Sequence, residues 1–190
     1  MNGEGNGNGG PGGDTSSGGK FENKVIRKAI RILRKNGYRF NKTGVKNVHT
    51  VMLGEKHVAT ICRERAFPKY LKCKKIDCRK LLGKEYWPDA VVIHEEQRML
   101  YIIEAKSQTQ GGSVDEKLQT CDFKKRQFKV LAKHLQMRNA EYIYVLEEAW
   151  FRNKTFYDEV FKYIKWVGCD YHFDEIPLAQ MGLYDTQPDS

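Results

Sequence analysis

Two short apolar runs separated by a polar turn constrain the fold of this chain more than any other feature. Residues 90–93 and 99–103 are apolar without a break, whereas residues 95–98 between them are Glu-Glu-Gln-Arg. Short apolar runs that end at polar turns are typical of buried strands. The pattern therefore predicts two neighbouring strands, over residues 89–94 and 99–104, that pair as an antiparallel hairpin.

The surrounding pattern extends this hairpin into a larger fold. A helical period of apolar residues begins at Phe21 and stops at Gly37, a residue type that favours a helix end. Further elements are expected as strands at 48–53 and 57–62, a long helix at 114–137, a strand at 141–147, a helix at 156–167 and an extended piece at 171–173. This order of helices and strands predicts an α/β fold, a mixed β-sheet flanked by helices.

Composition divides the chain into a tail and a body. Residues 1–19 contain nine of the 17 glycines and otherwise almost only polar residues. Such a segment cannot bury enough apolar surface to offset the entropy lost on ordering, so we expect a disordered tail. Residues 20–190 are expected to form a single domain.

The body is strongly basic. The whole chain carries a formal net charge of +9, and both acidic residues of the tail, Glu4 and Asp14, lie outside the body. The body therefore holds 33 basic against 22 acidic residues. This excess of positive charge favours polyanions such as nucleic acid, although many basic proteins bind nothing specific.

Several other classes of protein are not indicated. The longest apolar runs are far shorter than the roughly 20 residues that a membrane-spanning helix needs, so we expect no membrane partner. The N-terminus lacks the basic start and apolar stretch of a secretory signal, and five cysteines do not suggest a disulfide framework. These features predict an intracellular, cytoplasmic protein.

The predicted hairpin brings chemically useful side chains together. Asp89 opens its first strand, and Glu104 and Lys106 close the second, so all three are expected at one end of the sheet. Two carboxylates and the Ala105 carbonyl are hard oxygen ligands of the kind that Mg²⁺ prefers. The Lys106 ammonium is suited to orient a water molecule and to stabilise charge on a phosphate.

Each of these residues also has a purely structural interpretation. Pro-Asp is a common pair at the entry to a strand, which would account for Asp89. Glu104 and Lys106 alone would fit a solvated strand end with a weak surface ion pair. Their combination, at this spacing and on two adjacent strands, favours a functional site.

These residues resemble the signature of a known family. Pro88-Asp89 and Glu104-Ala105-Lys106 resemble the motif of the PD-(D/E)xK nuclease superfamily, and the order of elements is similar to that family's αβββαβ core. Residues 104–108 and 112–120 look like small type II restriction endonucleases or their cleavage subunits. The resemblance implies a restriction-endonuclease-like fold.

The resemblance also implies an activity. We expect a Mg²⁺-dependent DNA endonuclease that hydrolyses phosphodiester bonds, with Mn²⁺ able to substitute, and cuts at a short specific sequence. It implies that Asp89, Glu104 and the Ala105 carbonyl bind the metal, whereas Lys106 orients the attacking water. Glu22 of the first helix would supply a third acidic group, although at a helix start it can simply favour the helix dipole.

Two glutamines are weaker candidates for support of the site. Gln119 is expected on the helix after the motif, where related nucleases often carry a glutamine that faces the site. Gln108 lies just beyond the motif. For Gln119 the alternative is an ordinary exposed glutamine.

A basic stretch between residues 69 and 84 predicts contact with DNA phosphates, which position a protein without reading sequence. The alternative is a solvated loop. The residues proposed for these contacts are Lys69, Lys72, Lys74, Lys75 and Arg79.

One active site cuts one strand, so cleavage of double-stranded DNA requires a homodimer or a heteromeric partner subunit. Two other functions remain open at this point. One is a structure-selective or repair nuclease similar to a Holliday-junction resolvase. The other is a catalytically silent DNA-binding module, because fold alone does not establish function.

Overall fold

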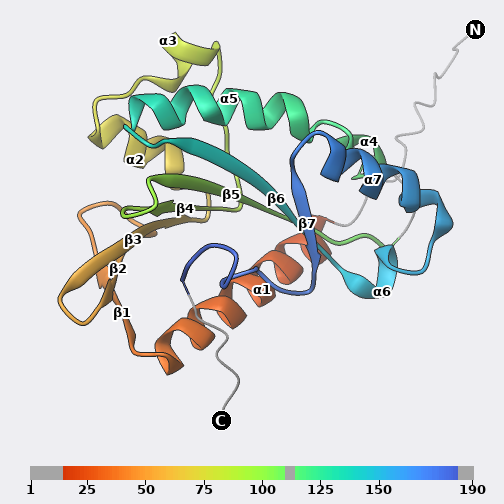
Figure 1. Cartoon of the computed structure of the whole chain (residues 1–190), viewed down its shortest axis with the longest axis horizontal. Coiled ribbons are helices and arrows are strands. Elements are labelled where there is room, and N and C mark those ends of the chain that lie inside the picture. Colours follow the sequence, from red (N-terminus) through yellow and green to blue (C-terminus); the bar gives the residue numbers. More distant parts are fainter. Residues whose placement is uncertain (1–14, 110–113, 184–190) are drawn as a thin grey trace, which may run out of the picture.

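Seven strands form one sheet in which strands adjacent in sequence are also adjacent in space. The computed structural model describes residues 15–109 and 114–183 (Figure 1). The strands are β1 (Tyr38–Lys42), β2 (Val48–Leu53), β3 (Lys56–Arg63), β4 (Ala90–His94), β5 (Met99–Lys106), β6 (Asn139–Leu146) and β7 (Asp170–Phe173). Pairing is antiparallel from β1 through β5 and parallel from β5 through β7, so the sheet is mixed.

Helices cover both faces of this sheet. They are α1 (Thr15–Lys35), α2 (Phe67–Cys73), α3 (Cys78–Leu82), α4 (Val114–Leu118), α5 (Cys121–His134), α6 (Glu148–Phe151), the 3₁₀ helix η1 (Thr155–Tyr157) and α7 (Asp158–Trp166). Figure 1 shows α1 along one face, and α5 with α2 along the other. The predicted α/β architecture is therefore confirmed.

The two faces of the sheet carry separate apolar cores. On β5, Leu100 and Ile102 pack towards α5, whereas Tyr101 and Ile103 pack towards α1. Successive strand residues point to opposite faces, so an apolar run without a break is what a strand buried on both sides requires. The two runs that dominate the sequence are central strands for this reason.

The structure differs from the sequence-based boundaries in several elements. α1 begins at Thr15, inside the segment 1–19 that was expected to be disordered, and residues 1–14 of that prediction lie outside the described residues. Extending a formed helix costs far less than nucleating one, so the amphipathic part of α1 can carry additional residues.

The expected long helix divides into α4 and α5, because the chain turns at residues 119–120. There the Thr120 hydroxyl donates to the Lys117 carbonyl, a local bond that competes with helix continuation.

Four elements were not predicted from the sequence: the edge strand β1 and the short helices α2, α3 and α6. The edge strand β1 is largely exposed and polar, so its pattern is weak. The short helices α2 and α3 lie within the basic stretch, where few apolar residues mark them. Phe67 and Leu71 of α2 nevertheless pack into the core on the α5 side.

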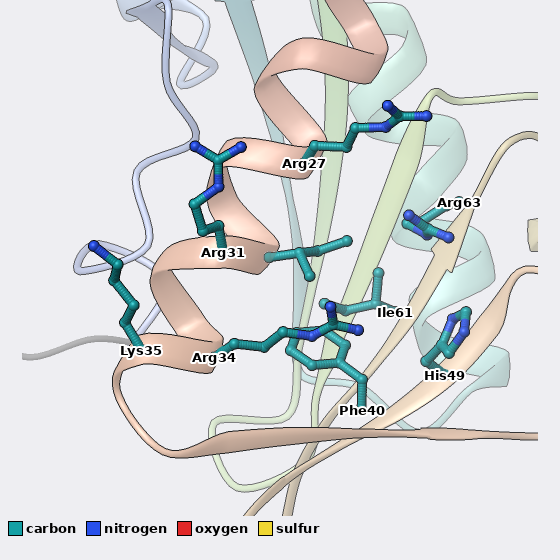
Figure 2. Close-up of a pocket in the computed structure, with 9 residues that line it drawn as sticks. Arg27, Arg31, Arg34, Lys35, Phe40, His49, Ile61 and Arg63 are labelled. Atoms are coloured by element: carbon teal, nitrogen blue, oxygen red, sulfur yellow. The ribbon is translucent and has the colours of Figure 1, made fainter.

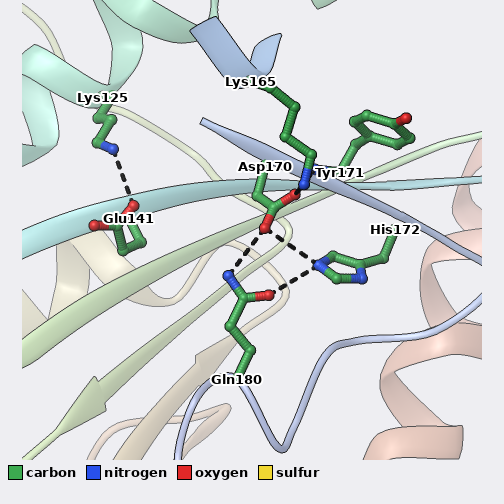
Figure 3. Close-up of polar contacts among 7 residues, drawn as sticks. All are labelled: Lys125, Glu141, Lys165, Asp170, Tyr171, His172 and Gln180. Atoms are coloured by element: carbon green, nitrogen blue, oxygen red, sulfur yellow. Dashed lines mark hydrogen bonds and ion pairs between the residues drawn. The ribbon is translucent and has the colours of Figure 1, made fainter. Parts of the chain in front are cut away.

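The C-terminal part of the described chain is held by β7. Asp170 contacts Lys165, accepts a hydrogen bond from Gln180 at 2.9 Å and lies 3.5 Å from His172 (Figure 3). Burial opposes the charged form of Asp170, but hydrogen bonds from His172, Lys165 and Gln180 outweigh it and hold its pKa well below the usual range. This network anchors the segment whose residues Leu178, Met181 and Leu183 complete the core under α1.

Candidate active site

β4 and β5 bring the predicted carboxylates and lysine together at one end of the sheet. Ala90 pairs with Ile103, so Asp89 lies directly before the paired part of β4 and beside the end of β5. The Ala105 amide donates to Asp89 Oδ2 at 2.8 Å. Lys106 Nζ donates to Glu104 Oε2 at 2.9 Å and lies 4.0 Å from Asp89 Oδ2. We call Asp89, Glu104 and Lys106 the acidic centre.

Strand geometry sets the direction of these groups. Glu104 and Lys106 alternate with Ala105, so they share the face of Leu100 and Ile102 and project towards α5. The N–H and C=O of a strand residue lie on the same side of the strand. Because the Ala105 N–H reaches Asp89, the Ala105 carbonyl faces the same gap beyond the end of β4.

Burial and crowding give the acidic centre unusual electrostatics. The side chains of Asp89, Glu104 and Lys106 are only 19%, 14% and 19% exposed. Burial, with a further contribution from the charge of Glu104, raises the pKa of Asp89 to about 7. Burial opposes the charged form of Lys106, but the surrounding carboxylates outweigh it and raise the pKa of Lys106. The Lys106 ammonium therefore keeps its proton. One ammonium does not balance the negative charge of two carboxylates.

Glu22 on α1 is electrostatically connected to the acidic centre. Burial raises the pKa of Glu22, an effect that Lys106 opposes and Glu104 reinforces. Glu22 also contributes to the raised pKa of Asp89. A third acidic side chain thus lies close enough to sense the other charges, although no hydrogen bond joins it to them within the described chain.

Two residues near the site were not among the candidates predicted from the sequence. Lys124 of α5 is half-buried, and its pKa is lowered by burial, with Glu104 and Asp89 opposing and Lys106 adding to that shift. Tyr142 of β6 is fully buried, and Glu104 adds to the burial that raises its pKa. Lys124 lies three residues after buried Cys121 on the inner side of α5, a spacing that a sequence search for inward-facing cations could have used.

The two candidate glutamines have different surroundings. Gln108 is 8% exposed, and neither its amide oxygen nor its amide nitrogen has a hydrogen-bond partner among the described residues. Buried polar atoms are almost always paired, so an orphaned amide two residues beyond Lys106 suggests a place for a ligand. Gln119 is exposed, and its amide donates to the Asp115 carbonyl at 3.4 Å. The structure does not bring Gln119 into hydrogen-bond contact with the acidic centre.

The donor set fits a hard divalent cation. In the parts of the chain that the structure describes, no three His, Cys, Asp or Glu side chains are grouped to hold a metal ion. The available oxygens are instead those of Asp89, Glu104 and the Ala105 carbonyl. Mg²⁺ is commonly bound through one or two carboxylates and keeps several waters, so this small set is sufficient.

The predicted DNA-contacting residues lie on α2, α3 and the turn between them. All five are exposed, and we call Lys69, Lys72, Lys74, Lys75 and Arg79 the basic run. Lys72 and Arg79 share the carboxylate of Glu85, at 3.1 and 3.5 Å. Lys74 lies over the ring of Tyr70. Part of the positive charge of the basic run is therefore already compensated within the protein.

Comparison with known proteins gives one result. A family model described as a PD-(D/E)XK nuclease superfamily domain matches residues 16–145, more than half of the chain. Neither the curated proteins nor the solved structures contain a match. No helix within residues 15–109 and 114–183 has the length and apolar character to cross a membrane.

Proposed function

Because the chain belongs to the PD-(D/E)XK nuclease superfamily, we propose that it is a metal-dependent endodeoxyribonuclease whose catalytic residues are Asp89, Glu104 and Lys106. One observation carries this proposal: a largely buried ammonium lies within 4.0 Å of two largely buried carboxylates at one end of the sheet. A purely structural ion pair would not need a second carboxylate whose pKa rises to about 7.

Asp89, Glu104 and the Ala105 carbonyl would hold the metal, for which we propose Mg²⁺, with Mn²⁺ as a substitute. When bound, such an ion polarises the scissile phosphate and compensates the carboxylate charge. The orphaned amide of Gln108 would then have a polar partner, either a ligand oxygen or a water. Glu22 adds negative charge close to the same group.

Lys106 acts as a fixed donor. Its raised pKa keeps the ammonium protonated, so Nζ orients a water by donation and does not remove its proton. Hydrolysis forms a bond between the water oxygen and phosphorus and breaks the bond from phosphorus to the sugar oxygen. The attacking water loses its proton to solvent, and the departing oxygen gains one. Lys106 also lowers the cost of negative charge that builds on the phosphate oxygens.

We further propose double-stranded DNA as the substrate and cleavage at a short specific sequence, as in small type II restriction endonucleases. One chain carries one acidic centre, so cutting both strands requires a homodimer or a partner subunit. The basic run contributes phosphate contacts on the α5 side of the sheet. Residues 20–190 act as a single nuclease domain inside the cell.

Plasmid digestion tests this proposal. Purified protein with and without Mg²⁺ is compared with the variants Asp89→Asn and Lys106→Met, and with Lys133→Met as a control on the exposed side of α5. Discrete fragments that require Mg²⁺ and disappear only in the first two variants support a sequence-specific nuclease. Nicking alone indicates a missing partner subunit, and cleavage of branched DNA only indicates a structure-selective nuclease. Binding without any cleavage contradicts the proposal and favours a silent DNA-binding module.

A further inference from the structure

A basic pocket lies between α1 and the antiparallel strands β1–β3. Its cavity volume is about 530 Å³. The charged lining is Arg27, Arg31, Arg34, Lys35 and Arg63, with His49 beside them, and none of the described acidic residues lines it. Figure 2 shows Arg27 and Arg34 extending from α1 towards the strands, and Arg63 and His49 on the facing strands. We call this cavity the basic pocket.

Three arginines of the basic pocket have no carboxylate partner among the described residues. In the part of the chain that the structure describes, Arg27, Arg34 and Arg63 form no ion pair with a carboxylate. The Nε atom of Arg63 is buried and has no hydrogen-bond partner. A buried donor of a charged group is costly to leave unpaired, so this atom is suited to a ligand oxygen.

One arginine is held in position by an aromatic ring. The Arg34 guanidinium lies 5.5 Å from the centroid of Phe40 on β1. Such a contact orients a planar donor group without using its N–H donors. Together with Ile61, Phe40 gives the pocket an apolar floor. A floor of this kind suits a phosphodiester chain, whose sugars are less polar than its phosphates. Arg27 and Arg34 extend towards the strands, whereas Arg31 and Lys35 extend away from them (Figure 2).

The basic pocket reaches the end of the sheet at which the acidic centre lies. Arg63 ends β3 and His49 lies near the start of β2, and both belong to the sheet end at which Asp89 enters β4. A second depression on α1, lined by Lys20, Lys24 and Arg27 among others, shares Arg27 with the basic pocket. At about 1.5 Å per helical residue, Arg27 and Arg34 lie roughly 8 and 18 Å along the helix axis from Glu22.

We propose that the basic pocket binds two or more backbone phosphates of the nucleic-acid strand that passes through the acidic centre. The inference rests on the proposed nuclease function, and it assigns to α1 and β3 a role that the sequence pattern had indicated for the basic run alone. The observations that carry it are the convergence of arginines from two elements without a carboxylate partner in the described chain, the unpaired Arg63 donor, and the position of Arg63 beside Ala90 at the sheet end where Asp89 enters β4.

The test is the salt dependence of DNA binding in metal-free buffer, where cleavage is absent. We compare the wild type with Arg34→Gln/Arg63→Gln, with Arg34→Lys/Arg63→Lys, and with Arg138→Gln as an exposed control before β6, at the opposite end of the sheet. Circular dichroism confirms that each variant is folded. The probe is a duplex oligonucleotide of about 25 base pairs, and the same preparations are assayed for cleavage with Mg²⁺.

The glutamine double variant is expected to bind at least about tenfold more weakly. The slope of log K against log salt should also become shallower by about 0.9 for each phosphate that the variant can no longer bind. The lysine double variant keeps most of the slope, and Arg138→Gln resembles the wild type. A glutamine variant with the wild-type slope and affinity overturns the inference, even if the wild type cuts DNA. A wild type that binds no duplex also overturns it. Pocket-dependent binding without cleavage overturns the proposed function alone and leaves the pocket in place.

Discussion

The acidic centre and the basic pocket are built on the same end of one sheet but carry opposite unbalanced charge. In the acidic centre, burial and a second carboxylate raise the pKa of Asp89 to about 7. In the basic pocket, burial lowers the pKa of His49, and the nearby cations Arg63, Lys42 and Arg34 lower it further. The acidic centre therefore opposes a further negative charge on Asp89, and the basic pocket opposes a further positive charge on His49.

The contrast indicates that an excess of unpaired charge can mark a functional site. A protein that folds for stability alone pairs its buried charges, as Lys125 and Glu141 do at 2.9 Å on the α5 side (Figure 3). The acidic centre and the basic pocket keep unpaired charge of opposite sign at the same end of the sheet. A bound metal cation would balance the first, and a bound phosphate anion would balance the second. Removing or titrating a charge on one side should therefore have an effect that the other side does not share.

Removing the cation of the acidic centre should have the largest effect. Lys106→Met leaves the carboxylates without their internal partner and removes the donor proposed to act on water and phosphate. The loss of one such donor typically lowers the rate of the chemical step by about 10²–10³-fold. Single-turnover cleavage of duplex DNA with Mg²⁺ measures it, with Lys133→Met as the control. A rate within tenfold of the wild type would exclude Lys106 from catalysis.

Removing one carboxylate should stabilise the metal-free protein in a pH-dependent way. The pKa of Asp89 rises from 3.8 to about 7 on folding, so the folded state holds a proton that the unfolded state releases in this range. Stability from this group is therefore lost as pH rises from about 4 to 7. In chelator, Asp89→Asn should melt several degrees above the wild type at pH 8, and the difference should shrink at pH 5.

The same variant tests the metal. Added Mg²⁺ or Mn²⁺ should raise the melting temperature of the wild type at pH 8, because a ligand that binds only the folded state stabilises it. A hundredfold excess over the dissociation constant corresponds to about 2.7 kcal/mol. Asp89→Asn should gain much less. Equal gains in both proteins would show that any metal binds elsewhere.

The basic pocket should respond in the opposite sense. Bound phosphates reduce the repulsion that Arg63, Lys42 and Arg34 exert on a protonated His49, so the pKa of His49 should rise when DNA binds. A nuclear magnetic resonance titration of the imidazole, with and without duplex in chelator, measures the shift, and His49→Gln assigns the signal. A pKa that stays unchanged at saturating DNA argues that no phosphate enters the pocket.

The basic run should give the smallest effect. Lys72 and Arg79 already share Glu85, so Lys72→Gln/Arg79→Gln should weaken duplex binding by less than about threefold. Binding at several salt concentrations, next to the double variant of the basic pocket, makes the comparison direct. A weakening greater than that of the pocket variant would reverse the assignment and return the main phosphate contacts to α2 and α3.

The parts of the site that sequence could predict are those made by local geometry. Asp89, Glu104 and Lys106 meet through one hairpin, so strand alternation and antiparallel pairing place them without further information. Lys124 and the basic pocket depend on how α5 and α1 pack across the sheet. That packing joins residues distant in the chain, such as Arg34 and Arg63, and no spacing in the sequence reports it.

The prediction of helices and strands also depended on local pattern: elements with a clear local pattern were predicted, and elements without one were missed. The range 48–53 predicted for β2 is the range observed, because residues typical of strands fill it and a turn at Gly54 ends it. The helices α2 and α3 were hidden because exposed lysines and arginines surround the few apolar residues that anchor them. In the sequence, the dense run of basic residues therefore indicated a charged surface but not the two helices that carry it.

The sequential order of the strands has a consequence for synthesis of the chain. From β1 to β5 every pairing joins segments that leave the ribosome one after the other, and such short-range contacts form fast. The parallel pairing of β5 with β6 must wait for the crossover that contains α4 and α5. The carboxylates thus assemble early, on a strand whose other edge is still open. Lys124 and Tyr142 arrive last, so the surroundings of the acidic centre would be complete in a nascent chain only when the crossover closes.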